Sequence, residues 1–396
     1  MTRDTTSTRH IAPLFAAGFT TAFGAHSVAA GLGSEFEALG SSLLTLGILL
    51  AVYDVAEVIL KPVFGTLSDR IGAKPVILGG LVVFTIMSAL GIFAHSALAL
   101  GLVRLGQGAA ASAFSPAASA AVARLSGPST GQYFGRYGAW KTLGYVLGPL
   151  IGAGLIFFSG LPALFAFMAV ISLAAAIWVW LKMPVLPILP KQRYTLADLA
   201  RQTVQPGFLV PTMVLAASTG ALGAAVGFLP LIGSKLGLNE MQSMGVVSIL
   251  AICSALVQPW IGRVNDQAWI SFATGMALGL LLIIAGLVSV AIWQSFATLL
   301  LSSLLLGTGV GISTPLGFAH LASTTPDERI GRTMGSAELG RELGDAGGPI
   351  LVGAVAATAS VSAGLWALAA MILAITLLGI LMLRLPDSPS KQGTIA

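Results

Sequence analysis

The sequence predicts an all-α integral membrane protein with twelve transmembrane helices, arranged as two pseudo-symmetric six-helix bundles. The first observation is composition, since 56% of the 396 residues are hydrophobic and 9% are charged, whereas about 25% are charged in soluble domains. The second is a mean hydropathy of +0.92, carried by apolar runs long enough to cross a bilayer. The third is that motifs of the first half of the chain recur in the second.

Each apolar run is expected to form a helix. Backbone N–H and C=O groups find no water inside a bilayer, so a spanning segment must be a helix or part of a closed barrel. The runs lack the alternation of polar and apolar residues that marks a barrel strand. Windows of about 20 residues place the twelve spans at 11–33, 41–64, 75–94, 97–121, 135–158, 162–182, 208–231, 241–263, 268–293, 295–320, 333–358 and 361–384.

The spans divide into two bundles and a linker. The N-terminal bundle is expected to cover residues 1–182, the linker 183–207 and the C-terminal bundle 208–396. The linker is rich in proline and acts as a tether between the bundles. Its segment 195–201 begins with a capping threonine, which favours a short helix lying at the headgroups.

Basic residues indicate the orientation. Lys and Arg are retained on the cytoplasmic side during insertion, and nearly all of those outside the spans fall on one side, with Lys235 opposite. Both termini and the linker are therefore expected in the cytoplasm, with the protein in the cell inner membrane. The net charge of +5 reflects this topology and gives no indication of nucleic-acid binding. Cys253, inside an apolar helix, is expected to be a small packing residue.

A repeat relates the two halves. Residues 258–266 repeat the frame of residues 61–69, and Gly148-Pro149 recurs as Gly348-Pro349, with Lys141 matched by Arg341. Two parallel repeats of six helices predict a binding site between them near mid-membrane, reached by rocking one half against the other. The sequence thus favours a transporter.

Three motifs carry a family resemblance. The loop after the second span resembles the signature of the major facilitator superfamily, with Ala73 in place of the usual basic residue and with the expected residues at Gly65, Leu67, Asp69, Arg70, Gly72 and Lys74. Residues 102–109 resemble the fourth-helix motif, whose arginine, here Arg104, the family associates with proton coupling. The fifth-helix motif of proton-driven exporters is resembled by residues 144–152, with Gly144, Gly148, Pro149 and Gly152.

The resemblance implies the major facilitator fold and the twelve-helix branch of proton-coupled drug and metabolite exporters. It also implies that Asp69 and Arg70 form a conformational latch, although they could merely anchor topology. The spacing of Gly144, Gly148 and Gly152 leaves one helix face without side chains. Close packing against a neighbouring helix is enough to explain this spacing. Pro149 could bend the helix.

Ionisable residues inside the spans are the strongest functional signal, because each is expensive in lipid and must face a partner or a water-filled cavity. Helical spacing puts them on one face of the second span and one face of the eleventh. These residues are Asp54, Glu57 and Lys61 on the second span, Glu338, Arg341, Glu342 and Asp345 on the eleventh, and Arg104 and Lys141 elsewhere.

Their depths predict a cytoplasmic gate. Because the second and eleventh helices are neighbours in the superfamily fold, we expect Lys61 to pair with Glu338 and Glu57 with Arg341. The buried charges left over are Asp54, Glu342, Asp345, Arg104 and Lys141. The carboxylates among them become the proton-carrier candidates, since burial in a dry cavity raises the pKa of a carboxyl toward neutrality. A static salt-bridge network that holds the halves together is the alternative.

Cavity walls are predicted from residues at similar depth, and any one of them could instead be a packing residue. The candidates are Phe23, His26, Tyr53, Gln107, Phe114, Lys141, Tyr145 and Phe228.

The predicted function is secondary active transport, by a proton-coupled antiporter that exports small amphipathic compounds or metabolites by alternating access. The alternative is a proton symporter that imports a polar or charged metabolite. No enzymatic activity, cofactor or metal is expected, because the chain has no Gly-Lys dipeptide for a phosphate-binding loop and no His-Glu-x-x-His pair. The expected partners are a small-molecule substrate, protons and the lipid bilayer, with the protein acting as a monomer.

Overall fold

The computed structural model describes residues 2–28, 43–188 and 205–384, and all the regular secondary structure in these ranges is helical. The elements are α1 (Thr2–His26), α3 (Leu43–Ile71), α4 (Ala73–Gly91), α5 (Ala97–Ser126), η1 (Gly127–Ser129), α6 (Thr130–Lys182), α8 (Pro206–Lys235), α9 (Glu240–Asp266), α10 (Phe272–Ile292), α11 (Phe296–Thr324), η2 (Asp327–Arg329), α12 (Ile330–Thr358) and α13 (Val361–Arg384). The predicted all-helical fold class is confirmed.

The helices differ from the predicted spans in detail. Spans 135–158 and 162–182 fall within the single element α6, whose helical path is broken at Gly160 (φ 75°, ψ 173°). Seven helical stretches of the described residues, one of them the run from Ala97 to Lys182, are long and apolar enough to cross a bilayer. The count of twelve spans stays a prediction. The end of span 11–33 and the segment 195–201 lie outside the described residues.

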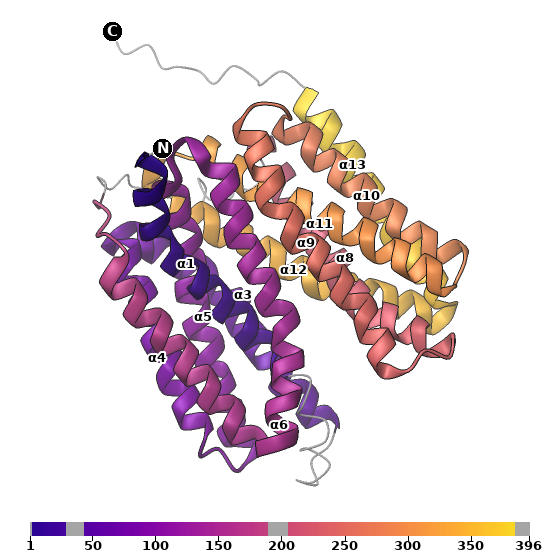
Figure 1. The fold of residues 1–396 in the computed structure, drawn as a ribbon, viewed down its shortest axis with the longest axis horizontal. Coiled ribbons are helices and arrows are strands. Elements are labelled where there is room, and N and C mark those ends of the chain that lie inside the picture. The colour runs from indigo at the N-terminus through magenta and orange to yellow at the C-terminus, as the bar shows by residue number, and fades with distance from the viewer. Residues whose placement is uncertain (1, 29–42, 189–204, 385–396) are drawn as a thin grey trace.

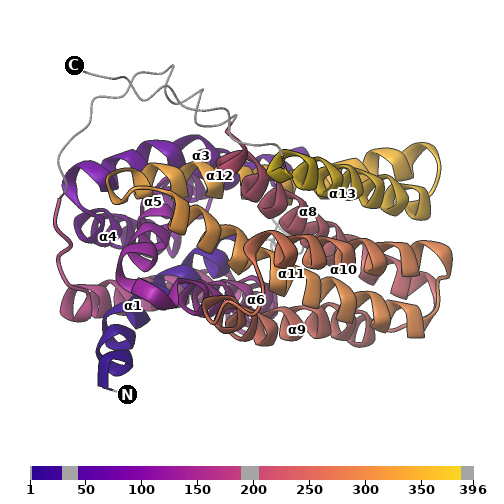
Figure 2. The ribbon, with the colours of Figure 1, turned by 90° about the horizontal axis from the view of Figure 1, so that it is seen from above.

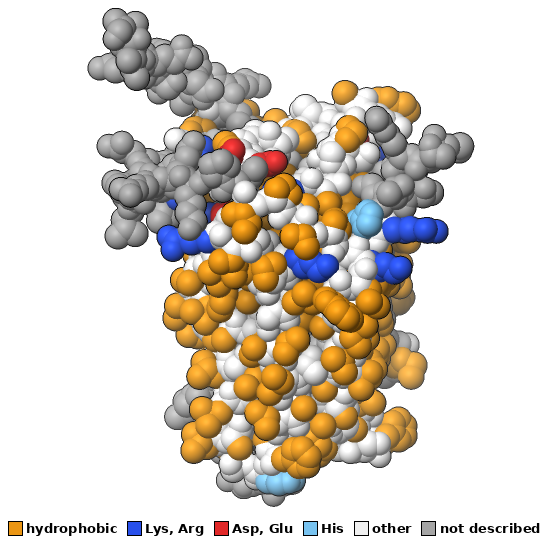
Figure 3. Space-filling model, turned by 90° about the vertical axis from the view of Figure 1, so that its left-hand side faces the viewer, with side chains coloured by type: hydrophobic (Ala, Val, Ile, Leu, Met, Phe, Trp, Pro, Cys, Tyr) orange, Lys and Arg blue, Asp and Glu red, His pale blue; other side chains and the backbone are white. Residues whose placement is uncertain are grey.

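The helices form two bundles that lie side by side, α1 to α6 in one and α8 to α13 in the other (Figures 1 and 2). Each bundle has a buried apolar core, with Phe84 and Phe114 central to the first and Leu280 and Leu306 to the second. Large apolar side chains also cover the outside, as at Phe157 and Phe158, which are more than 80% exposed. Figure 3 shows these side chains over the flank of the molecule, with Lys and Arg gathered in a band toward one end.

Glycines set the spacing of the helices. A Cβ at Gly144 would lie 2.5 Å from the Phe19 carbonyl oxygen, and one at Gly148 would lie 3.3 Å from that of Phe23. The fifth-helix motif therefore packs the backbone of α6 directly against α1, and Pro149 follows directly after the second of these glycines. Gly344 and Gly348 make the equivalent approach of α12 to α8.

We expect the substitution Gly152→Val to destabilise the protein, because its side chain would collide with the carbonyl of Ser27, the residue that follows α1. Overpacking of this kind costs about 1–3 kcal/mol, and the melting temperature of the detergent-solubilised protein measures it. Gly154→Val is the matched control, since nothing lies within 4 Å of a Cβ there. Equal melting temperatures of the two variants would contradict the packing role.

Candidate functional site

Six ionised groups meet where the two bundles touch, three carboxylates and three cations. The first half of this network centres on Lys61 of α3, whose Nζ lies 2.8 Å from Oε1 of Glu57 and 2.7 Å from Oε1 of Glu342 on α12. The same Nζ lies 3.7 Å from Oε2 of Glu338. The Lys61 side chain is fully buried, so its charge is balanced entirely by these carboxylates.

The second half of the network centres on Glu338 of α12. Lys141 of α6 donates to both of its carboxylate oxygens at 3.0 Å, and the Ser119 hydroxyl donates at 3.1 Å. Arg341 donates from Nε to Glu338 at 3.2 Å and pairs through its other end with Glu342. The charges of the six groups sum to zero, as burial of ions requires.

The observed pairing differs from the predicted gate. The expected contact of Lys61 with Glu338 is present, and at 3.7 Å it is the longest of the three contacts that Lys61 makes with carboxylates of the described residues. Within the described part of the chain Glu57 pairs with Lys61 and not with Arg341, because a spacing of four brings the two side chains together on α3. Glu342 and Lys141, expected to be left over, belong to the network.

Arg104 has a different environment. Its guanidinium donates to the carbonyls of Gly24 at 2.9 Å and Ala25 at 3.3 Å, and to Gln107 at 3.2 Å. It also lies 4.2 Å from the centroid of the Tyr53 ring. The carbonyls belong to the last turn of α1, where a cation complements both the unpaired backbone groups and the helix dipole. Arg104 thus fixes the end of α1 to α5.

The other two proton-carrier candidates lie outside the six-membered network. Asp345 accepts a hydrogen bond of 3.4 Å from the Tyr145 hydroxyl, which comes from the opposite bundle. The Tyr145 ring in turn lies 3.8 Å from that of His26. Among the described residues Asp54 makes no hydrogen bond or ion pair, and its side chain is exposed.

Two carboxylates fasten the bundles at the end where α3 and α9 finish, here called the latch end. Asp69 accepts hydrogen bonds from the backbone N–H groups of Gly331 and Arg332, at 2.7 and 2.8 Å. Asp266 accepts from Gly131 and Gln132, also at 2.7 and 2.8 Å. Each carboxylate therefore caps the first turn of a helix in the other bundle, which otherwise has unpaired N–H groups and a positive dipole end.

The remaining signature residues have separate roles. Gly65 lets α3 approach α12, since a Cβ there would lie 2.5 Å from the Gly331 carbonyl oxygen. Gly72 turns the chain into α4 with φ 95°. Lys74 donates to the carbonyls of Trp180 and Met183, at 2.9 and 2.6 Å, and so caps the end of α6. Arg70 is exposed, which leaves the latch to Asp69.

Burial affects both latch carboxylates, which lie beyond the ends of the predicted spans 41–64 and 241–263. It raises the pKa of the Asp69 carboxyl to about 6, opposed by the two N–H groups that it accepts from. The pKa of Asp266 is raised for the same reason. In the closed arrangement each carboxylate is therefore held by its hydrogen bonds against the loss of hydration.

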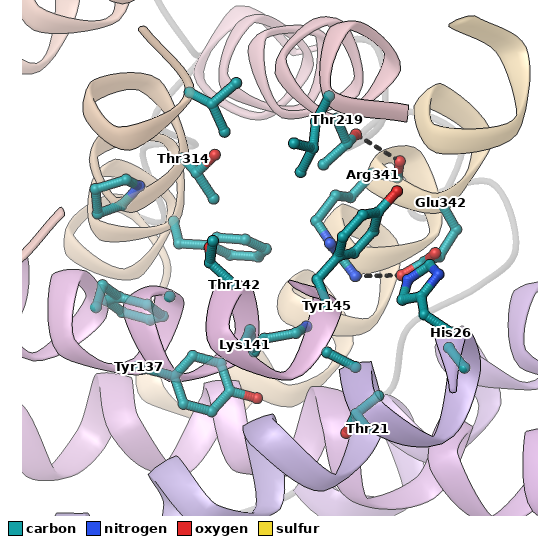
Figure 4. Close-up of a pocket in the computed structure, with 18 of the residues that line it drawn as sticks. Thr21, His26, Tyr137, Lys141, Thr142, Tyr145, Thr219, Thr314, Arg341 and Glu342 are labelled. Carbon is teal, nitrogen blue, oxygen red and sulfur yellow. Dashed lines mark hydrogen bonds and ion pairs between the residues drawn. The ribbon is translucent and has the colours of Figure 1, made fainter. Parts of the chain in front are cut away.

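A cavity adjoins the charge network between the bundles. Its free volume is about 50 Å³, which is room for a few water molecules, so a larger molecule would fit only if the bundles moved apart. Figure 4 shows Lys141, Tyr145, Arg341, Glu342 and His26 around this space. The side chains of Arg341 and Glu342 remain 16% and 17% exposed, so water in the cavity reaches the network through them. The rest of the lining includes Thr21, Ala22, Ala25, Glu57, Phe134, Tyr137, Gly138, Thr142, Thr219, Leu222, Val310, Thr314, Pro315 and Phe318.

Of the predicted wall residues, His26, Lys141 and Tyr145 line this cavity. The others lie elsewhere: Phe23, Tyr53, Gln107 and Phe114 are buried inside the first bundle, and Phe228 is half-buried against the core of the second. Depth along a helix is readable from sequence, but the direction in which a side chain points depends on how each helix is rotated in its bundle.

Sequence reasoning missed the hydroxyl groups of the cavity. Thr21, Thr142, Thr219 and Thr314 line it, and Thr219 donates to the backbone carbonyl of Arg341 at 2.8 Å. Threonine is common in membrane helices, where it bonds to its own backbone, so its presence gave no signal. The role of Asp266 was detectable, because it occupies the position of Asp69 in the repeated loop.

Comparisons with known proteins agree with this arrangement. A sequence profile of the Major Facilitator Superfamily matches the chain over residues 14–288 and 221–395. The chain belongs to this superfamily. The transporter is 22% identical over 329 residues to an uncharacterized MFS-type transporter of Methanocaldococcus jannaschii, which covers 80% of this chain and 83% of the relative.

Two further comparisons concern proteins whose names refer to a compound or a class of compounds. The transporter is 27% identical over 303 residues to a chloramphenicol resistance protein of Pseudomonas aeruginosa, covering 72% of each chain. The crystal structure of the human organic anion transporter superposes with a TM-score of 0.78 at 18% identity, over 94% of this chain and 99% of that one. At this identity the structural likeness shows a shared fold.

We expect Glu338→Gln to destabilise the transporter, because it leaves Lys141 and Arg341 without their shared carboxylate in a buried site. Removing one partner of a buried ion pair costs about 3–5 kcal/mol. Melting temperature and the yield of monodisperse protein in detergent measure the effect. Glu328→Gln, at an exposed position of η2, is the control, and a Glu338→Gln variant as stable as this control would refute the role of the network.

We expect Asp69→Asn to open the latch end, because the amide lacks the negative charge and one of the two acceptor oxygens that cap α12. The loss of about 1 kcal/mol lowers the closed-to-open ratio about fivefold. Spin labels at the exposed positions Pro128 and Ser323, introduced after Cys253→Ser, report the distance between the bundles. Asp327→Asn, in η2, is the control. An unchanged distance distribution in Asp69→Asn would contradict the latch.

Proposed function

We propose that the protein is a proton-coupled antiporter that exports small amphipathic compounds by alternating access. The observation that carries this proposal is the neutral network of six buried ionised groups that joins the two bundles beside the cavity. Burying these charges costs desolvation free energy, and ionisable residues inside a membrane protein are for that reason a sign of function. The family supplies the transport activity itself.

Proton binding would loosen the network through its accessible member. Glu342 faces the cavity and holds Lys61 across the bundle interface. A protonated Glu342 no longer balances the charges of Lys61 and Arg341, so the cations repel each other and the latch end is driven open. Asp345 is a second acceptor, and its bond from Tyr145, which lines the same cavity, also crosses the interface.

The cavity lining supports amphipathic substrates. Phe134, Phe318 and Tyr137 offer aromatic faces, and the threonine hydroxyls offer hydrogen bonds. The relative in Pseudomonas aeruginosa is a chloramphenicol resistance protein, which is consistent with export of compounds of that kind. An importer of a charged metabolite by proton symport is the second candidate, favoured by Lys141 and Arg341 in the lining.

The orientation is part of the proposal. Lys and Arg gather toward the latch end in Figure 3, and positive residues are retained in the cytoplasm. The latch end and both termini would then be cytoplasmic in the cell inner membrane, and the cavity would load protons from outside.

Proteoliposomes containing a pH-sensitive dye test the proposal. We expect lipophilic cations or phenicol antibiotics, added outside acid-loaded vesicles, to cause outward proton release, and Glu342→Gln to reduce its rate at least about tenfold, as loss of a proton-transfer group does. Glu328→Gln should behave as the wild type. Proton entry together with the compound would instead establish symport, and no proton movement with any compound would reject coupling.

A further inference from the structure

The junction of α6 with α9 repeats the side-chain bonds of the junction of α3 with α12, but with uncharged groups. In the charged junction Lys61 contacts Glu57 and Glu342, at 2.8 and 2.7 Å. In the other, Gln258 Nε2 donates to the hydroxyls of Ser254 at 3.1 Å and Thr142 at 2.8 Å.

The two sets of residues occupy equivalent positions. Lys61 and Gln258 each stand eight residues before a latch carboxylate, 61 before 69 and 258 before 266. Each contacts the residue four positions earlier on its own helix. Their partners on the facing helices, Glu342 and Thr142, both stand eleven residues after the first glycine that a latch carboxylate binds, 342 after 331 and 142 after 131.

The backbone of the two junctions matches as well. Gly65 meets Gly331 where α3 crosses α12, and Gly262 meets Gly131 where α9 crosses α6. Asp69 and Asp266 each accept two backbone N–H hydrogen bonds next to these glycine contacts. The same backbone arrangement occurs at both junctions. The interfaces therefore have the same geometry and differ in charge.

The difference extends to the position of Glu338, which is occupied by Gly138 in the uncharged junction. The missing side chain provides the space for the Gln258 amide oxygen, which a Cβ on Gly138 would meet. Lys141 comes from the same helix but binds Glu338 in the charged junction. Titratable groups surround Lys61 and its partners Glu57 and Glu342 on every packed helix. They are Tyr53 and Asp54 on α3, Glu338, Arg341 and Asp345 on α12, Tyr137, Lys141 and Tyr145 on α6, His26 on α1 and Arg104 on α5.

We infer that two side-chain clusters divide the work of closure: the cluster of Gln258, Thr142 and Ser254 in the α6–α9 junction is a proton-independent fastener, and the proton-responsive bonds beside the cavity are those of Lys61 in the α3–α12 junction. The latch carboxylates Asp69 and Asp266 can bind protons in both junctions alike, so they do not distinguish the two. Amide and hydroxyl groups do not titrate in the physiological range, so their bonds have the same strength at any proton concentration. The bonds of Lys61 weaken whenever Glu57 or Glu342 binds a proton. This inference rests on the proposed proton coupling and assigns it to one side of the interface.

The test compares matched double variants, using the spin labels at Pro128 and Ser323 to measure the open fraction of the latch end without substrate. Lys61→Gln with Glu342→Thr replaces the two groups that cross the α3–α12 interface by those of the uncharged junction. It removes one cation and one carboxylate, so the formal charge of the network stays at zero, and the new amide can donate to Glu57 as Gln258 donates to Ser254. Gln258→Leu with Thr142→Val removes the bonds of the uncharged junction. The open fraction is measured between about pH 5.5 and about pH 8, a range that covers shifted carboxyl groups.

We expect acid to raise the open-to-closed ratio of the wild type by about tenfold, the effect of 1.4 kcal/mol. Lys61→Gln/Glu342→Thr should close normally at the alkaline end but lose most of this response. Gln258→Leu/Thr142→Val should raise the open fraction at every pH and keep the tenfold response. The inference would be overturned if both double variants lost the acid response equally, or if Lys61→Gln/Glu342→Thr kept it.

A relocation variant separates this inference from the proposed function. Adding Gln258→Lys and Thr142→Glu to the first double variant moves the charged pair to the equivalent position of the other junction, and it should restore the acid response. Failure to restore it, in a protein that remains monodisperse, contradicts the equivalence of the junctions. A wild type that shows no response to pH contradicts proton coupling itself.

Discussion

The burial of ionised groups between two apolar bundles is the constraint on which the rest of the structure depends. Moving a single ion into such a site costs several kcal/mol even after relaxation, so each of the six charges must have a partner. Lys61 and Lys141 come from the first bundle, and Glu338 and Glu342 from the second. The balance exists only while the bundles touch, and separation requires each bundle to find another source of compensation, such as a proton or water.

Close helix approach makes this network possible. Glycines at both junctions let the helix backbones meet, and this brings side chains of the facing helices within bonding distance of each other. The latch carboxylates then fix the register by capping the first turn of the facing helices. Rigid contacts at the latch end and a changeable charge state beside the cavity are the two properties that alternating access needs.

Much of the architecture was predictable from sequence, but the pairing of side chains was not. Helical spacing placed Glu57 and Lys61 on one face of α3, and Glu338 and Glu342 on one face of α12. The choice of partner depends on side-chain reach and helix rotation, which is why Glu57 was expected to pair with Arg341 and Lys141 to stay outside the network. Lys74 belongs to the same signature as Asp69, yet it binds carbonyls at the end of α6 and takes no part in the contact between the bundles made by Asp69.

A charge exchange at the central contact tests the account most directly. Lys61→Glu and Glu342→Lys each place like charges within about 3 Å, where repulsion in a buried site is strong. Transport driven by a pH gradient in proteoliposomes should be lost in either single variant. It should be recovered only in part when both are combined, because opposite charges again face each other across the interface while Glu57 and Arg341 keep like-charged neighbours on their own helices. Full transport by a single variant, or no recovery in a double variant that remains monodisperse, would contradict a network that couples protons to movement of the bundles.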